Sequence, residues 1–288
     1  MLRAWLAARC GAPAAYSGVG CARDGVPNRP SGASAGRVLR VGPGEPVASI
    51  AAASRLARDG DTVEIKAGDY HGDVAQWEQT DLTIRGVGGM VRLFADGKAH
   101  GGKAIWVMGR KGSNFRVSNI AFVGARVPDR NGAGIRFEGG KLVVRNCLFW
   151  GNENGLLAGA SVGTSLHIED SEFGYNGNGD GLTHNLYGGA IDLLKVSGSY
   201  FHHANVGHLL KSRARVNEII YNRLTDETGG RASYELDFPN GGLAVVMGNI
   251  IQKGPDAENS AVMSYGREGI SWDRNELVFV SNTVVNDH

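Results

Sequence analysis

The sequence has few features of disulfide-stapled, membrane-spanning or nucleic-acid-coating proteins. Its three cysteines, Cys10, Cys21 and Cys147, form neither a disulfide framework nor a zinc-binding spacing. No apolar run approaches the ~20 residues that a membrane helix requires, so we expect no membrane span. The 30 Lys and Arg residues nearly balance the 29 Asp and Glu residues, and the formal net charge is +1. This balance argues against a nucleic-acid partner.

Helical stretches are also scarce, and a short β pattern recurs instead. Each copy has alternating apolar residues, then Asn, Asp or Gly, and an aromatic residue three places further on. The clearest copies have their marker at Asn119, Asn146, Asp170 and Gly198, and weaker copies have it at Asn222, Asn249 and Asn282. The markers are roughly 24 to 28 residues apart, with one longer final step.

This repeat predicts an all-β solenoid, a right-handed single-stranded parallel β-helix. Asn and Gly tolerate the left-handed backbone conformation that a sharp bend needs, which explains the marker position. The inward Leu, Val, Ile and Phe side chains then stack on their counterparts in neighbouring coils. An antiparallel sandwich is the alternative, but it predicts hairpin turns and no fixed register between segments.

The two ends of the chain differ from the repeats. Residues 1–36 are rich in Ala, Gly, Pro and Arg, and Arg9 and Gly11 interrupt their apolar stretch early, so this segment is a poor signal peptide and we expect it to be disordered or wrongly assigned. The β-helix domain is expected to span residues 37–288. The last repeat, 277–285, lies close to the final residue, so we expect the domain to lack its C-terminal cap.

A short helix is expected to cover the first coil. Pro46 is well placed to open it, and Ile50, Ala53 and Ala57 recur at helical spacing until Gly60 can end it. The alternating stretch Gly60-Asp-Thr-Val-Glu-Ile follows, and Gly68-Asp-Tyr comes next. This arrangement resembles the N-terminal cap and first coil of the pectate-lyase-like β-helix superfamily. The resemblance implies a secreted or periplasmic location.

A second strand follows the marker strand in each coil, and several of these strands can be aligned. If Leu186, Leu210 and Leu236 point inward, alternation places their neighbours on the outer face. The predicted outward residues are Asn185, Tyr187, Leu209, Lys211, Arg213, Glu235 and Asp237. They lie on three turns about 4.8 Å apart and are expected to line a polar groove.

The charge pattern around this groove is one-sided. The stretch 193–217 contains no acidic residue, but it contains Lys195, Lys211, Arg213 and Arg215. A basic strip on a nearly neutral protein favours an anionic ligand. The alternative is a solvated surface with incidental charges. The residues expected to bind the substrate are Asn185, Asp237, Arg215 and Asn240.

Two histidines lie 24 residues apart and are expected to stack on one another. Alternation turns His184 and His208 inward together with Leu186 and Leu210. A buried histidine that is bonded to backbone is the common outcome at such a position. A catalytic or metal-binding role is the alternative, since strand ends often break alternation through bulges.

The stretch that begins at Lys211-Ser212 and continues to Gly229, followed by Val246 to Asn249, resembles the core of polysaccharide lyase family six, the alginate and chondroitin lyases. The resemblance implies that Lys211 is the Brønsted base. Two positions depart from the family pattern. Glu235 stands where the family has an arginine acid, and Val206 and His208 stand near the position of an acidic calcium ligand. Calcium is therefore implied by the family only, and no metal site is predicted from the residues.

The predicted activity is β-elimination, or the related C5-epimerisation, on the uronate units of an acidic polysaccharide. Elimination requires a base, a cation that neutralises the carboxylate, and an acid for the leaving oxygen. Lys211 is the candidate base, because neighbouring arginines favour its neutral amine form. Arg213 is the candidate cation that neutralises the carboxylate, and Tyr187 or His208 is the candidate acid. His184 and Glu235 complete the predicted catalytic set.

Two other functions remain open at this stage. Glu235 and Asp237 lie two residues apart in one strand, about 6.6 Å by strand rise, which is compatible with the carboxyl pair of a glycoside hydrolase. The other alternative is a non-catalytic β-helix that binds glycans along its surface. The concentration of unusual residues between positions 184 and 240 favours an enzyme.

Overall fold

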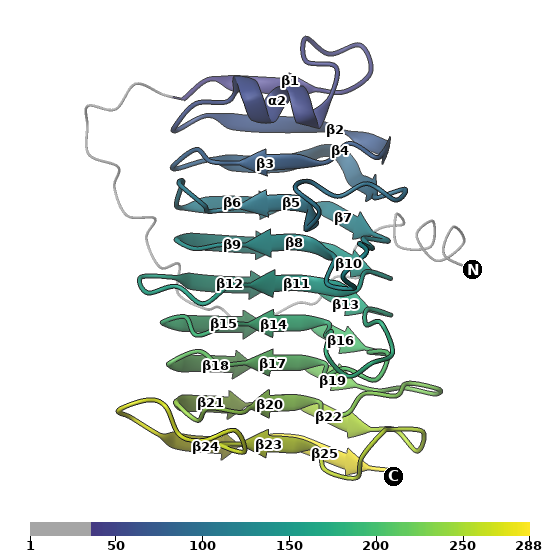
Figure 1. Cartoon of the computed structure of the whole chain (residues 1–288), viewed down its shortest axis with the longest axis vertical. Helices are drawn as coiled ribbons and strands as arrows, with labels where there is room; N and C mark the ends of the chain where they lie inside the picture. Colours follow the sequence, from purple (N-terminus) through teal and green to yellow (C-terminus); the bar gives the residue numbers. More distant parts are fainter. Residues whose placement is uncertain (1–35) are drawn as a thin grey trace, which may run out of the picture. The chain divides into compact units, whose positions relative to one another are not determined.

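The computed structural model describes residues 36–288. The prediction for residues 1–36 therefore falls, except for Gly36, outside the described residues. The described residues form successive coils that stack one on the next, as Figure 1 shows. All pairings between the labelled strands are parallel, and each strand pairs with the equivalent strand of the next coil. The predicted parallel β-helix is confirmed.

Three columns of strands run along the stack. The first column contains β1 Val38–Val41, β2 Thr62–His71, β4 Thr83–Phe94, β6 Phe115–Ser118, β9 Lys141–Arg145, β12 Ser165–Glu169, β15 Leu193–Ser197, β18 Val216–Ile220, β21 Leu243–Met247 and β24 Glu276–Val280. The second column contains β7 Ile120–Val123, β10 Leu148–Trp150, β13 Glu172–Gly174, β16 Tyr200–His202, β19 Arg223–Thr225, β22 Ile250–Lys253 and β25 Thr283–Asn286. The long strands β2 and β4 pass from the first column into the second and join the two into one sheet.

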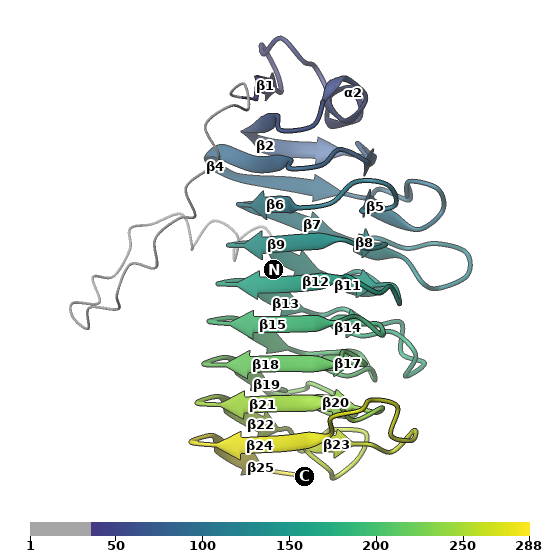
Figure 2. The same cartoon turned by 90° about the vertical axis from the view of Figure 1, so that its left-hand side faces the viewer.

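The third column is a separate eight-stranded sheet. It contains β3 Ala75–Trp77, β5 Ala104–Met108, β8 Ala133–Phe137, β11 Asn154–Ala158, β14 Leu186–Gly188, β17 Leu210–Ser212, β20 Leu236–Phe238 and β23 Met263–Tyr265. In Figure 2, loops extend beyond the strands on the side of this sheet. These loops form the walls of the site described below.

The sharp bend between the first and second columns requires a left-handed residue. Asn119, Asn146, Asp170 and Gly198 have φ values of 64°, 50°, 47° and 61°, as the repeat predicts. In the next coils, however, the left-handed residues are Tyr221, Gly248 and Ser281. The predicted markers Asn222, Asn249 and Asn282 are therefore displaced by one position.

The displaced asparagines have a different role. Asn222 donates to the amide oxygen of Asn249 at 3.1 Å, and Asn249 donates to that of Asn282 at 2.9 Å. Asn222 and Asn249 are buried. These side-chain oxygens also accept hydrogen bonds from the backbone amides of Asn222 and Asn249, so the buried polar groups are satisfied. Asn is therefore required at these positions for hydrogen bonding and not for a left-handed backbone conformation.

The aromatic residues that follow the bends stack inside the coils. The ring centroids of Phe122, Phe149, Phe173 and Phe201 are separated by 5.0, 4.4 and 4.7 Å in succession. All four side chains are fully buried. This stack confirms the predicted position of the aromatic residue in the repeat. Cys147 also packs in the interior, as expected, and burial raises the pKa of its thiol to about 12.

The first coil is covered by helix α2, which spans Ile50–Leu56. The predicted start at Pro46 is wrong, because Ser49 is the N-cap and its hydroxyl accepts from the Ala52 amide. The Asp73 carboxylate also accepts hydrogen bonds from the backbone amides of Ile50 and Ala51.

At the other end of the stack, the apolar side chains of β24 and β25 are exposed, with Leu277 and Phe279 each 39% exposed. In residues 36–288 no helix has the length and apolar character to cross a membrane.

Candidate functional site

The outer face of the eight-stranded sheet carries one continuous row of side chains. Strand register places one residue of each strand beside its counterpart in the next coil. In order along the stack, the row is Gln76, Val107, Arg136, Leu157, Tyr187, Lys211, Asp237 and Ser264. The row brings together Tyr187, Lys211 and Asp237, as the sequence predicts.

A hollow of about 560 Å³ lies over the middle of this row. Its floor includes Arg136, Leu157, Tyr187 and Lys211. Asn131 and Leu182 line it from loops that precede the sheet, and residues 159–160 and 189–190 line it from connections that follow the sheet. The hollow therefore crosses four adjacent coils along the stacking direction.

A cluster of ion pairs occupies one end of the hollow. The ammonium group of Lys211 forms an ion pair with Asp237 Oδ2 at 3.0 Å and donates to Glu268 Oε1 at 3.1 Å. The guanidinium group of Arg213 contacts the other oxygen of Glu268 at 2.6 Å. The Lys211 and Asp237 side chains are only 11% and 4% exposed, so their pair is nearly shielded from water. Two cations and two carboxylates balance one another here.

Arg213 also holds two neutral groups. Its Nε donates to the Tyr187 hydroxyl at 2.9 Å, and its Nη1 donates to the side-chain oxygen of Asn240. Burial lowers the pKa of Arg213, but hydrogen bonds to Glu268 and Tyr187 outweigh it and raise the pKa overall. Because the Tyr187 oxygen accepts a bond from a cation, its own proton is left available for a ligand in the hollow.

His184 and His208 stack on one another, with ring centroids 4.7 Å apart. Both are buried and bonded to backbone, because His184 Nδ1 accepts from the His208 amide and His208 Nδ1 accepts from the Tyr234 amide. The prediction that the His184 and His208 side chains point into the core of the coils is nevertheless wrong. His184 lines the hollow, and His208 Nε2 lies 3.4 Å from Asp237.

These contacts determine the protonation of both rings. Burial lowers the pKa of His208 to about 4 although Asp237 opposes the shift, and burial followed by repulsion from His208 lowers the pKa of His184 well below its usual value. Both imidazoles are therefore neutral near pH 7. Since each Nδ1 accepts a backbone bond, each Nε2 carries the hydrogen and acts as a donor.

Three residues that were predicted to face outward are directed into the interior. Asn185, Leu209 and Glu235 are each 0% exposed. Each is in a bend directly before its strand, so two successive side chains point inward and strict alternation fails. Asn185 belongs to an interior amide network and donates to the His202 carbonyl at 2.8 Å.

Glu235 is consequently not on the same face as Asp237. Its Oε1 accepts from Lys253 Nζ at 3.3 Å, and both side chains are fully buried. Burial raises the pKa of Glu235 to about 8, although Lys253 opposes the shift. The predicted Glu235 and Asp237 carboxyl pair therefore does not form.

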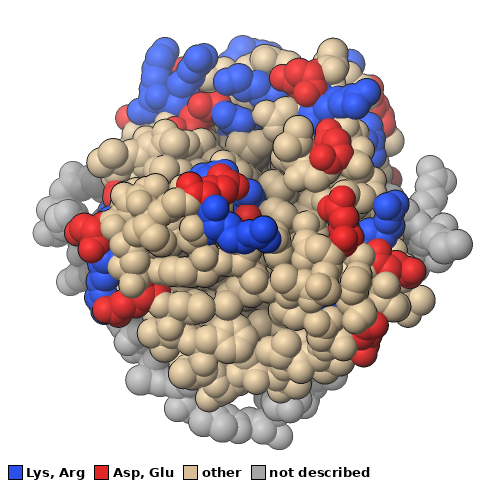
Figure 3. All heavy atoms as spheres, turned by 60° about the horizontal axis from the view of Figure 1, so that its bottom comes forward, with Lys and Arg blue, Asp and Glu red and all other residues tan. Residues whose placement is uncertain are grey.

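The basic strip seen in the sequence is neutralised by carboxylates from neighbouring coils. Lys195 pairs with Glu218 at 3.0 Å, and Arg215 approaches Asp192 at 3.7 Å. Arg215 is exposed and is not among the residues that line the hollow. In Figure 3, Lys and Arg side chains adjoin Asp and Glu side chains in several places. The excess of basic residues in the stretch 193–217 therefore does not produce a uniformly basic surface.

Glu268 is a member of the cluster that sequence reasoning missed. It lies in the loop after β23, outside the repeated pattern, and its side chain is 47% exposed. Its amide donates to the Pro239 carbonyl at 2.9 Å, which places the loop beside the hollow. Burial raises its pKa, but bonds from Arg213 and Lys211 outweigh this and lower the pKa, so Glu268 is ionised.

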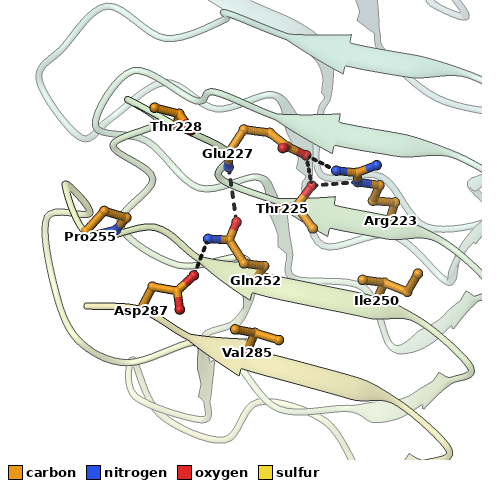
Figure 4. A pocket seen from close by; sticks show the side chains of 9 residues that line it. All are labelled: Arg223, Thr225, Glu227, Thr228, Ile250, Gln252, Pro255, Val285 and Asp287. Atoms are coloured by element: carbon orange, nitrogen blue, oxygen red, sulfur yellow. Dashed lines mark hydrogen bonds and ion pairs between the residues drawn. The ribbon is translucent and has the colours of Figure 1, made fainter.

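A second pocket lies on another face, over β19, β22 and β25. Its polar side chains bond mainly to one another, as Figure 4 shows. Glu227 pairs with Arg223 at 2.5 Å, and Gln252 donates to Asp287 at 2.9 Å. The hollow over the eight-stranded sheet is the stronger candidate site, because it brings Tyr187, Lys211 and Arg213 together with the buried His184 on one face.

The calcium ion that the lyase resemblance implies does not fit the residues present. Calcium requires about six to eight oxygen ligands. Val206 and His208 supply no side-chain oxygen, and the neighbouring carboxylates of Asp237 and Glu268 pair with Lys211 and Arg213. Among residues 36–288, no group of three or more His, Cys, Asp or Glu side chains is arranged to hold a metal.

Fold and site together define a right-handed parallel β-helix with a polar hollow on one sheet. A solved structure of a pectin methylesterase mutant in complex with a hexasaccharide is similar over 84% of this chain and 93% of that chain, with a TM-score of 0.54 and 11% identity. At this identity the likeness shows the fold, a right-handed parallel β-helix. No family model matches the chain. No curated protein matches it either.

Proposed function

We propose that this protein is a carbohydrate-active enzyme that acts on an acidic polysaccharide in the hollow of the eight-stranded sheet, most directly by β-elimination. The observation that carries the proposal is the convergence of Lys211, Arg213, Tyr187, Asp237 and Glu268 at one end of that hollow. A secreted or periplasmic location is part of the same proposal. The hexasaccharide in the similar β-helix structure supports a polymeric ligand.

Elimination breaks the bond between C4 and the glycosidic oxygen of a uronate. A base takes the proton on C5, a C4–C5 double bond forms, and an acid protonates the leaving oxygen. Arg213 is the proposed cation that neutralises the substrate carboxylate, which makes the C5 proton more acidic. Lys211 is the proposed base, and Tyr187, whose oxygen already accepts from Arg213, is the proposed acid. His208 is a weaker candidate acid, since it is neutral and its Nε2 lies 3.4 Å from Asp237.

The substrate must first displace Glu268. This carboxylate bridges Lys211 and Arg213 in the way that a uronate carboxylate would. When the substrate takes its place on Arg213, Lys211 loses its contact with Glu268 and keeps its contact with Asp237.

The test is a panel of uronate polymers, with product formation followed by the ultraviolet absorbance of the new conjugated double bond. Absorbance that increases with wild-type protein and is lost in Lys211→Arg supports elimination. Inversion at C5 without absorbance, detected by nuclear magnetic resonance of the polymer, identifies the related epimerisation instead. Absence of either change with every acidic polymer contradicts the proposal.

Glycoside hydrolysis is a second candidate, because a different carboxyl pair is present. The Asp237 and Glu268 oxygens lie 3.0 and 3.1 Å from the same Lys211 nitrogen, so they are no more than about 6 Å apart. Hydrolases use two carboxyl groups at roughly 5 to 10 Å. Reducing ends released without new ultraviolet absorbance, and lost in both Asp237→Asn and Glu268→Gln, would favour this activity. Binding without any turnover would favour the non-catalytic glycan-binding function.

A further inference from the structure

The two ends of the hollow differ in charge balance. At the Lys211 end, two cations face two carboxylates, as described above. At the other end, Arg136 lies on the floor, and its Nε contacts Glu138 Oε1 at 3.2 Å. Lys103 contacts the same oxygen at 3.1 Å. Two cations therefore share one carboxylate, and this group of three carries one uncompensated positive charge.

Leu157 and Tyr187 lie between the two ends, and Val107 lies on the far side of Arg136. Val107 and Leu157 are 5% and 7% exposed, and they pack with Ala104 and Ala133 in a cluster separate from the main core. Tyr187 packs against this cluster from the next coil. Leu157 is nearly buried, but Tyr187 is only partly buried and lines the hollow, so its ring is the apolar surface that a ligand can reach between the two ends. Sugar rings present an apolar face of C–H groups that packs well on an aromatic ring.

The length of this surface follows from the strand register. Arg136 pairs in register with Leu157, Leu157 with Tyr187, and Tyr187 with Lys211. Three strand spacings of ~4.8 Å separate Arg136 from Lys211 by ~14 Å. A bound polymer with one sugar over each of the four register positions from Arg136 to Lys211 reaches from one end to the other with about four units.

We propose that Arg136, supported by Lys103, forms an anion subsite that binds a carboxylate of an acidic oligosaccharide about three units away from the unit at Lys211. The ligand class rests on the proposed function, but the subsite is a statement about binding and does not require turnover. Arg136 is suited to this role because its guanidinium can bind a carboxylate in a bidentate manner. Removal of Arg136 leaves Glu138 paired with Lys103, so the fold keeps its ion pair.

The chain offers a matched control. Arg85 pairs with Glu64 at 2.6 Å, and Arg40 approaches the same carboxylate at 3.9 Å. This second group of three has the same charge arrangement as the Arg136 group. It lies on β1, β2 and β4, in the other sheet. Arg85→Gln therefore removes one shared cation at a distance from the hollow.

The experiment measures binding of size-graded oligogalacturonates and alginate oligosaccharides, dimer to hexamer, by calorimetry on the full chain. We expect Arg136→Gln to weaken binding of the tetramer and hexamer by about tenfold or more, as for loss of a charge-assisted hydrogen bond, and to leave the dimer unchanged. Arg85→Gln should change neither. The difference between Arg136→Gln and wild type should shrink at high salt.

The outcomes separate the subsite from the reaction. Length-dependent loss in Arg136→Gln without any turnover in wild type supports the subsite and contradicts the enzyme proposal. Turnover that Arg136→Gln leaves unchanged at all lengths, in both affinity and rate, overturns the subsite and leaves the enzyme proposal intact. Equal losses in Arg136→Gln and Arg85→Gln also overturn it, since general electrostatics would then explain both. If no acidic oligosaccharide binds, both proposals are refuted.

Discussion

The most informative single change is Lys211→Arg. Arginine keeps the positive charge and the approximate length of lysine, but a guanidinium does not deprotonate in proteins and cannot act as a base. Loss of a positioned base costs about 10²–10⁴ in rate, or about 2.7–5.4 kcal/mol in barrier height at 1.36 kcal/mol per factor of ten. We therefore expect at most about one hundredth of the wild-type rate.

The structure shows why alanine would be the wrong substitution. Lys211 is the 3.0 Å partner of Asp237, and both side chains are nearly buried. Truncation of the lysine would leave a buried carboxylate without its cation, which costs about 3–5 kcal/mol in stability. Any loss of activity would then be confounded with a loss of folded protein. Arginine can keep the contacts with Asp237 and Glu268 and avoids this problem.

The assay compares initial rates on the polymer that gives the strongest signal, with folding checked by circular dichroism. Lys195→Arg is the control, because Lys195 also pairs with a carboxylate at 3.0 Å but lies on β15, in the other sheet. We expect the control to retain its full rate. If Lys211→Arg retains more than about a tenth of the wild-type rate, the lysine acts only through its charge and the base must be sought elsewhere.

Three further substitutions test other parts of the structure. Burial raises the pKa of Glu235 from 4.5 to about 8, so the stability that its protonated form contributes is complete below pH 4.5 and is lost as the pH rises through about 8. The melting temperature of Glu235→Gln should therefore depend less on pH than that of wild type over this window. Parallel pH curves for the two proteins would contradict the pKa shift. Glu268→Gln removes a half-exposed carboxylate that competes with the substrate carboxylate for Arg213, so the affinity for an acidic oligosaccharide, measured by calorimetry, should increase about two- to fivefold. Unchanged affinity with abolished turnover would instead indicate that Glu268 is a catalytic carboxyl group. Phe173→Ala opens a gap between Phe149 and Phe201 and should cost about 3–5 kcal/mol in denaturant unfolding; a loss below about 1 kcal/mol would show that the stack is not a major source of stability.

Much of the fold can be predicted from the sequence because its information is local and repeated. The bends at Asn119, Asn146 and Asp170 and the phenylalanines three residues later depend only on backbone conformation and on the spacing within one coil. Leu186 and Leu210 point inward for the same reason. A repeated pattern of this kind specifies parallel coils in register, since each apolar residue can be buried only on its counterpart above or below.

The candidate site depends on contacts that no local pattern encodes. Lys211 and Arg213 could be placed on the outer face by alternation, but their partner Glu268 is 57 residues from Lys211 and lies in a loop without a repeat signature. Alternation predicts Glu235 on the outer face, but a bend directly before its strand interrupts the alternation and the side chain is buried. The basic strip predicted from the stretch 193–217 is not a basic surface, for a related reason. Charges on a solenoid pair across coils, so the neighbours that decide the net charge of a surface are about one coil away in sequence, and only the stacked structure shows which of them meet.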